Sequence, residues 1–243
     1  GGHREFAADK TGQAFPADGL RFATGLRDMQ ALDWNPADRS LYNVMQGRNK
    51  LNEAGARLYT EEDSERGVAD PMHRITRNAN LGWPYTHFDP RTMKRMQAPE
   101  YGGKPGDVVT DNAYSTPVAA FAAHSSPLDI AFYNATRFPA SYRGGAFVAL
   151  HGGADGERDQ VGYKVMFVPR PPAKGFAKPV VFADGFAGGV RRSEVAEFRP
   201  SAVAVAPNGG LYVMESEKGR IWRIDYVGTG KGRAAKPMVT ARR

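Results

Sequence analysis

The sequence predicts an all-β protein built as a β-propeller, and three observations carry that prediction. Short apolar segments bounded by Gly, Pro, Asn or Asp dominate the chain, as short antiparallel strands do. No long stretch with the 3.6-residue period of an amphipathic helix competes with them. The unit of strand, polar turn and strand recurs at distant places in the chain, which is typical of propeller blades.

The recurring unit occurs three times. Residues 31–44 join an apolar strand to a Leu/Tyr/Val strand through a turn that contains Pro36. Residues 123–152 repeat the arrangement with a histidine at each end, and residues 202–214 repeat it with Asn208 in the turn. Because each copy has the composition of a β-hairpin, we interpret the copies as successive blades.

The strands follow in chain order from the same pattern. We predict them at residues 20–24, 29–34, 41–45, 118–122, 128–133, 146–150, 163–168, 180–183, 202–206, 211–215 and 221–227. The window 52–66 is polar and favours a loop or a short helix. Long loops at 50–74 and 89–111 could cap a pocket, since loops of that length are often functional.

Composition excludes several classes of protein. The chain has 243 residues, of which 41% are hydrophobic and 24% charged, so it is globular. It contains no run of about 18 apolar residues that would cross a membrane. It has no cysteine, which excludes disulfides, thiolate metal sites and a cysteine nucleophile.

The net charge of +7 suggests an anionic partner. The basic residues are scattered, however, and the densest group forms a basic tail at 231–243, which we interpret as a solvated terminus. No aromatic residues alternate with these charges, so nucleic-acid binding is not supported. The first residues contain no apolar targeting segment, and the first of them is not Met. We interpret them as a processed or trimmed end.

The number of blades is limited by length. A blade takes about 40–50 residues and a closed ring takes about four to eight blades, so this chain supplies at most about four or five. We therefore expect residues 1–243 to form a single β-propeller domain or the C-terminal portion of one, with the incomplete ring favoured.

Polar residues gather where neighbouring strands end. Arg27 precedes one predicted strand, and Gln46, Arg48 and Asn49 follow its partner. Such junctions point toward one end of a blade, so these side chains could converge on an anion, which the planar guanidinium of arginine suits. The alternative is that they are ordinary polar residues of surface turns.

The five histidines divide by context. We expect His3 to be disordered at the terminus, and His73 and His87 to lie at the surface in or beside polar loops. His124 and His151 flank core strands, where they either belong to a cofactor pocket or make hydrogen bonds within the core.

Seven segments in order resemble one enzyme family. They are residues 25–27, 46–49, 80–85, 124–127, 142–152, 162–165 and 199–205. Through them the chain resembles the pyrroloquinoline quinone (PQQ)-dependent sugar dehydrogenases, in particular the L-sorbosone dehydrogenase-like and pyranose dehydrogenase-like branch. Trp83, in the third segment, would either stack on a planar quinone or sugar or anchor blade packing.

This resemblance implies a six-bladed propeller of the quinoprotein glucose dehydrogenase type, with PQQ over the central channel and Ca²⁺ beside it. The implied reaction oxidises a sugar or sugar-derived aldehyde, of aldose or sorbosone type, by hydride transfer to the quinone. The implied partners are a small-molecule sugar and an electron acceptor such as a cytochrome or quinone. A periplasmic or secreted location follows from the resemblance alone.

The resemblance also implies roles for individual residues. Arg27 would polarise the quinone carbonyl, and Gln46 and Gly47 would lie beside the calcium. The residues that would bind the cofactor are Arg27, Gln46, Arg48, Asn49, His124, His151, Lys164 and Arg199, with Lys164, Arg199 and Arg48 neutralising its carboxylates.

The chain departs from the family pattern at three points. Asp28 stands where members commonly have Asn, and the segment 153–156 lacks an aromatic and a basic residue of the usual continuation. The family's general base comes from a region upstream of this chain, so no general base is assigned. Two other functions stay open: a calcium-dependent propeller hydrolase of lactonase type, and a non-catalytic propeller fragment. The basic character of the candidate residues favours an anionic cofactor over the hydrolase.

Overall fold

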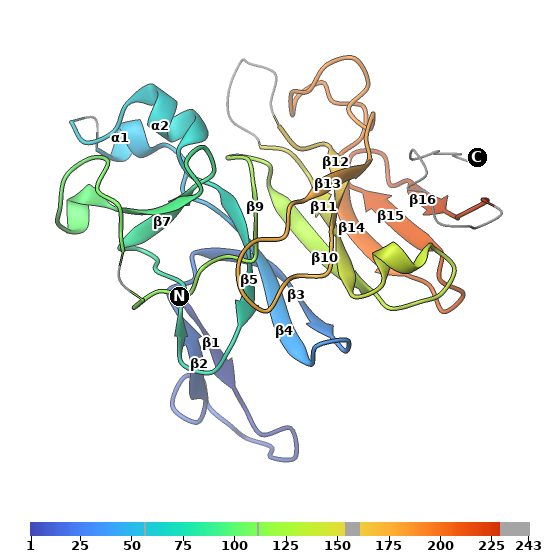
Figure 1. Cartoon of the computed structure of the whole chain (residues 1–243), viewed down its shortest axis with the longest axis horizontal. Coiled ribbons are helices and arrows are strands. Elements are labelled where there is room, and N and C mark those ends of the chain that lie inside the picture. Colours follow the sequence, from blue (N-terminus) through green and yellow to red (C-terminus); the bar gives the residue numbers. More distant parts are fainter. Residues whose placement is uncertain (56, 111, 154–160, 229–243) are drawn as a thin grey trace.

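The computed structural model describes residues 1–55, 57–110, 112–153 and 161–228, and the predicted basic tail at 231–243 lies outside them. Almost all regular structure in these residues is β, arranged in separate small sheets (Figure 1). Three of the sheets follow one another along the chain and pack side by side as blades.

The blades are antiparallel throughout. The first contains β3 (Asp28–Asn35), β4 (Ser40–Gln46), β5 (Asp70–Ile75) and β9 (Ala119–Phe121). The second contains β10 (Pro127–Tyr133), β11 (Gly145–Leu150), β12 (Lys164–Val168) and β13 (Val180–Ala183). The third contains β14 (Pro200–Val205), β15 (Leu211–Glu215) and β16 (Ile221–Ile224).

Two smaller sheets and four short helices complete the described chain. The sheets are β1 (Gly2–Glu5), β2 (Leu20–Thr24) and β6 (Ala79–Asn80), and the hairpin of β7 (Thr86–Asp89) and β8 (Lys94–Gln97). The helices are α1 (Leu51–Ala54), α2 (Glu61–Arg66), η1 (Pro99–Tyr101) and η2 (Ala140–Tyr142). None of these described helices has the length and apolar character that crossing a membrane requires.

The blades are repeats of one another in detail. The first strand of each blade shifts its register against the second strand near its start, between Met29 and Ala31, between Pro127 and Asp129, and between Pro200 and Ala202. An extra residue at an equivalent place in three sheets is a bulge that bends each strand in the same way.

Apolar layers fill the spaces between blades. The layer between the first and second blades includes Tyr42, Val44, Met72, Ile130, Phe132 and Val148. The layer between the second and third blades includes Tyr133, Phe147, Phe182, Val203, Leu211 and Val213. Burying one such side chain contributes about 1.5–3 kcal/mol, so these layers fix how the blades pack.

Two aspartates also link the innermost strands. One Asp33 oxygen accepts a hydrogen bond from the backbone N–H of Phe132 in the next blade, at 2.7 Å. One Asp129 oxygen accepts from the backbone N–H of Val203 in the blade after that, at 2.9 Å. The other oxygen of each carboxylate accepts from the following residue's own N–H.

The predicted fold class is confirmed: the chain is an all-β propeller, and in the described residues its row of blades is open, because no strand pairing joins the first blade to the third. Every predicted strand corresponds to a strand of the structure, and the window 52–66 contains the short helices α1 and α2. The largest boundary differences are in the third blade, where β14 begins at Pro200 and β16 ends at Ile224.

Three predictions about loops and the terminus are wrong. The supposed loop at 50–74 ends in β5, which pairs with β4 and β9 in the middle of the first blade. The supposed loop at 89–111 contains β8 and η1. His3 is not disordered, because it lies in β1 opposite Ala23 of β2.

Candidate functional site

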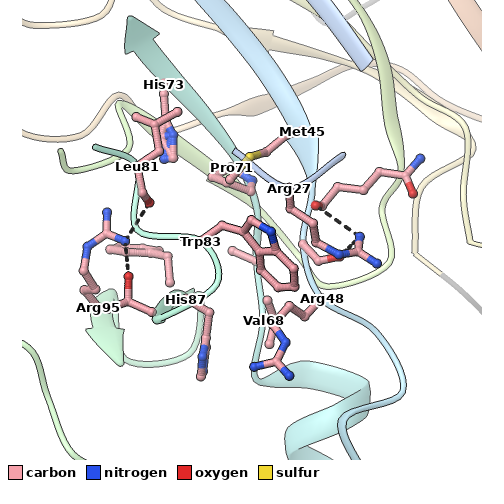
Figure 2. Close-up of a pocket in the computed structure, with 15 residues that line it drawn as sticks. Arg27, Met45, Arg48, Val68, Pro71, His73, Leu81, Trp83, His87 and Arg95 are labelled. Atoms are coloured by element: carbon pink, nitrogen blue, oxygen red, sulfur yellow. Dashed lines mark hydrogen bonds between the residues drawn. The ribbon is translucent and has the colours of Figure 1, made fainter. Parts of the chain in front are cut away.

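A hollow opens where β4 and β5 meet the segment between β6 and β8 (Figure 2). Its lining combines cations, aromatic rings and two imidazoles, a composition suited to a planar anion. The side chains that carry this character are Arg27, Arg48, Arg95, Trp83, Phe88, His73 and His87.

Arg27 reaches the site because the chain turns sharply just before it. Gly25 has φ +74°, and a Cβ atom there would lie 2.5 Å from the backbone nitrogen of Gly82, so only glycine allows this close approach. The Arg27 guanidinium donates to the carbonyl oxygen of Gly47 at 2.6 Å and to the Asn49 side-chain oxygen at 3.0 Å.

A longer hydrogen bond of 3.4 Å joins Arg27 to the carbonyl oxygen of Gln46. The structure therefore brings together Arg27, Gln46, Gly47 and Asn49, four of the residues that the sequence predicted at one site. We call these four residues the Arg27 group.

Two guanidiniums, those of Arg27 and Arg48, lie beside the Trp83 ring (Figure 2). The Arg27 and Arg48 carbons lie 5.9 Å and 5.6 Å from the centre of its ring. Arg48 differs from Arg27 in that it forms an ion pair with Glu100, whose carboxylate also accepts from the Tyr59 hydroxyl. The Arg48 charge is therefore already compensated.

The prediction that His73 lies at the surface is wrong, whereas His87 lies in β7 and is half-buried. His73 lies in β5 with only 2% of its surface exposed, and neither ring nitrogen has a hydrogen-bond partner among the described residues. Burial lowers the pKa of His73 to about 3, and burial together with Arg48 lowers the pKa of His87 to about 4. Both imidazoles are neutral at pH 7, and both line the hollow.

A second set of predicted residues lies at the adjoining ends of the second and third blades. Arg199 donates to the carbonyl oxygen of His151 at 3.3 Å and to that of Gly152 at 2.7 Å. Lys164 lies opposite Leu150, the residue before His151, in the register of β11 and β12. We call His151, Gly152, Lys164 and Arg199 the Arg199 group.

The cations of the Arg199 group have acidic neighbours. Arg199 lies 3.7 Å from Glu217, and Lys164 lies 3.3 Å from Asp184. The His151 ring bonds to the Ser216 hydroxyl at 2.8 Å. Burial, with Arg199 nearby, lowers the pKa of His151 to about 4, so this imidazole is neutral at pH 7.

His124 belongs to neither group, because its ring bonds to a helix. Its ring bonds to the carbonyl oxygen of Ser64 in α2 at 2.9 Å. Its backbone has φ +60°, an uncommon conformation for a residue other than glycine. His124 therefore fastens α2 to the start of the second blade.

Sequence reasoning missed Asp70, which lies between the two groups. Its carboxylate is 3% exposed and accepts 2.7 Å hydrogen bonds from the backbone N–H groups of Gly47 and Ser126. Burial raises the pKa of Asp70 to about 6, against the opposing effect of the two N–H donors. The polar character of this segment concealed that it is a strand.

One known protein family matches most of the chain. The model of the TrAA12-like family matches residues 4–227. No curated protein sequence matches the chain. The chain is similar to the calcium structure of a Carbohydrate-Active Enzymes Family AA12 protein from Trichoderma reesei, with a TM-score of 0.62 and 18% identity over 84% of this chain and 53% of that one.

Two dehydrogenase structures have the same fold. A glucose dehydrogenase gives a TM-score of 0.56 and 17% identity over 87% of this chain and 49% of that one. The PQQ-bound aldose sugar dehydrogenase of Streptomyces coelicolor gives a TM-score of 0.50 and 19% identity over 87% of this chain and 44% of that one. The chain thus spans about half the length of the structures it matches.

Proposed function

Because the chain belongs to the TrAA12-like family, we propose that it acts in a PQQ-dependent oxidoreductase that oxidises a sugar or a sugar-derived aldehyde. The observation that carries this proposal is the series of hydrogen bonds that joins the Arg27 group, through Asp70 and then Ser126, to the Arg199 group along the adjoining ends of three blades. That arrangement offers several cations and amides to one anionic, planar cofactor.

The Arg27 group fits a quinone that carries carboxylates. Arg27 forms no ion pair among the described residues, although it lies close enough to Asp70 to act toward lowering the pKa of that carboxyl, so its N–H groups can still bind an anion. Hydrogen bonds between charged partners are about twice as strong as neutral ones. Trp83 presents an aromatic ring beside that charge, which supports stacking on a flat ligand.

The fit of Ca²⁺ depends on Arg27. The carbonyl oxygens of Gln46 and Gly47 are hard ligands of the kind Ca²⁺ prefers. In the structure, however, both accept hydrogen bonds from Arg27. Because a guanidinium repels Ca²⁺, binding of the metal to these oxygens requires Arg27 to turn away from them, toward the cofactor.

When bound, PQQ would supply the two-electron acceptor that the protein itself lacks. The chain's own contribution would be electrostatic, with Arg27 donating to a quinone oxygen and thereby stabilising negative charge on it. Lys164, Arg199 and Arg48 would face the cofactor carboxylates in spite of their acidic neighbours. His124 and His151 would fix the surrounding backbone, and no residue is proposed as general base.

The finer features of the function are also proposals. We propose an aldose or sorbosone as substrate, a cytochrome or a quinone as electron acceptor, and a periplasmic or secreted location. The likeness of the chain to a glucose dehydrogenase and to an aldose sugar dehydrogenase supports a sugar substrate.

The hydrolase alternative receives no support. A carboxylate-rich metal cage needs several acidic or imidazole groups around one point. Among the described residues, no three His, Cys, Asp or Glu side chains gather in that way.

A titration tests the proposed function. The purified chain is mixed with Ca²⁺ and increasing PQQ, and quenching of tryptophan fluorescence reports binding, since Trp83 lies in the site. Dye reduction is then recorded with glucose and with sorbosone. Saturable quenching supports the proposal, whereas no quenching at millimolar Ca²⁺ contradicts it.

A further inference from the structure

Among the residues that the structure describes, Asp70 is the one side chain that bonds directly to both the Arg27 group and the turn at Ser126, which supports the Arg199 group. One carboxylate oxygen accepts from Gly47 in the first blade, and the other accepts from Ser126 at the start of the second. Each distance is 2.7 Å. The Gly47 carbonyl in turn accepts from Arg27. Asp70 therefore sets how far the Arg27 group lies from Ser126.

The connection continues beyond Ser126 into the Arg199 group. Ser126 has φ +54°, a strained conformation that persists only where the surroundings fix it. Its carbonyl accepts from the His151 N–H at 2.9 Å, and the carbonyl of Ser125 accepts from the Gly152 N–H at 3.0 Å. Arg199 donates to the carbonyls of the same two residues, His151 and Gly152.

We propose that Asp70 is a positioning residue of the quinone site, which holds the Arg27 group and the Arg199 group at the separation that one cofactor spans. This role rests on the proposed function. It requires a carboxylate in particular, because an ionised carboxylate only accepts hydrogen bonds and can serve two N–H groups at once. An asparagine side chain in its place would turn an NH₂ group toward one of the two donors.

Asp33 provides a matched control within the same pair of blades. Its carboxylate also accepts two backbone N–H groups, from Trp34 at 2.8 Å and from Phe132 at 2.7 Å. Asp33 thus links the first blade to the second, as Asp70 does, but it bonds neither to Gly47 of the Arg27 group nor to Ser126. If Asp70 only stabilises the packing of the blades, both variants should lose PQQ affinity alike. If Asp70 positions the cofactor-binding residues, only its substitution should lower PQQ affinity.

The experiment compares wild type, Asp70→Asn and Asp33→Asn. Thermal midpoints are measured first, and PQQ affinity is then measured with saturating Ca²⁺ at a temperature where circular dichroism shows all three folded. We expect both variants to melt earlier, and only Asp70→Asn to lose quinone affinity, by about tenfold or more, the equivalent of one charged hydrogen bond. Affinity within about twofold of wild type is expected for Asp33→Asn.

Two results overturn the positioning role: unchanged affinity in Asp70→Asn, or an equal loss in both variants. Both presuppose that wild type binds quinone. If wild type itself binds none, the proposed function fails, and this role of Asp70 fails with it.

Amide hydrogen exchange tests the same role without a substitution, should Asp70→Asn not fold. In the wild-type chain, PQQ with Ca²⁺ is expected to slow exchange at Gly47 and Ser126, the donors to Asp70. Exchange at Trp34 and Phe132, the donors to Asp33, is expected to stay unchanged. Equal slowing at all four amides, or none at Gly47 and Ser126, contradicts the positioning role.

Discussion

The Arg27 group and the Arg199 group use the same residue type in different electrostatic settings. Arg27 donates to neutral oxygens and lies beside an aromatic ring. Arg199 also donates to backbone carbonyls, but it has Glu217 3.7 Å away. The difference indicates that Arg27 has charge available for an incoming anion, whereas Arg199 chiefly fixes the backbone of the second blade.

The largest expected effect is on ligand binding at Arg27. Arg27→Ala should weaken PQQ binding by about 10- to 100-fold, because it removes a charged hydrogen bond of roughly 1.5–3 kcal/mol. The free energy of unfolding should fall by less than about 1 kcal/mol, because the main acceptor of Arg27, Gly47, is partly exposed and water can replace the guanidinium, whereas Gly152, the main acceptor of Arg199, is buried. Fluorescence titration and urea unfolding measure the two quantities.

Arg77→Ala is the control for Arg27→Ala, because Arg77 pairs with Glu5 and stacks on Phe22 away from the hollow. Its PQQ affinity should equal that of wild type. Parallel losses of affinity and stability in Arg27→Ala would contradict the electrostatic assignment.

Arg199→Ala should show the opposite balance. Loss of its hydrogen bonds to His151 and Gly152 leaves two carbonyls of the second blade without their donor. The free energy of unfolding should fall by about 1–3 kcal/mol, and PQQ affinity should fall less than in Arg27→Ala. Urea unfolding with the same titration measures both, and a smaller stability loss than in Arg27→Ala would reverse the comparison.

His73 gives the Arg27 side of the site a distinctive pH dependence. Its pKa is lowered to about 3 in the folded chain but returns to about 6.5 on unfolding. Between these values the unfolded state binds a proton that the native state does not, so stability falls as pH falls. The slope from this residue is about 1.4 kcal/mol per pH unit near pH 5.

His73→Asn should remove that slope, whatever its effect on stability at neutral pH. Urea unfolding from pH 4 to 8 checks this expectation. Toward acid, the wild-type stability should fall relative to that of the variant by about 1.4 kcal/mol per pH unit near pH 5, and the two curves should run parallel between pH 7 and 8. Parallel curves over the whole range would show that His73 takes up a proton in the folded chain.

The smallest expected effect concerns Arg48. Glu100→Gln removes the carboxylate that compensates Arg48, so PQQ affinity should rise about two- to threefold at low salt and less at high salt. Glu62→Gln is the control, because Glu62 pairs with Arg91 and does not line the hollow. A decrease of affinity in Glu100→Gln would mean that Glu100 is needed to orient Arg48.

The strands of the three blades could be predicted because their apolar alternation and turn residues are local signals. β5 could not, since Asp70, Pro71, His73 and Arg74 give it the composition of a loop. Its burial arises from pairing with β4 and β9, which are well separated from it along the chain. Asn43 of β4, which lies opposite His73 in β5, is buried by the same pairing. Both polar atoms of its side chain have no partner among the described residues.

The candidate site was predictable in part. Arg27, Gln46 and Asn49 meet as expected because they end neighbouring strands. Asp70 was not predictable, since its two partners are 23 and 56 residues away. The acidic neighbours of Lys164 and Arg199 were likewise hidden, because pairing across loops leaves no pattern in sequence.

A crystal structure of the chain with PQQ and Ca²⁺ tests the central claim most directly. We predict that the quinone lies beside the Arg27 guanidinium and that at least one of its carboxylates lies within hydrogen-bond distance of Lys164 or Arg199. A quinone that contacts only one of the two groups, or that binds at another face of the blades, would contradict the account.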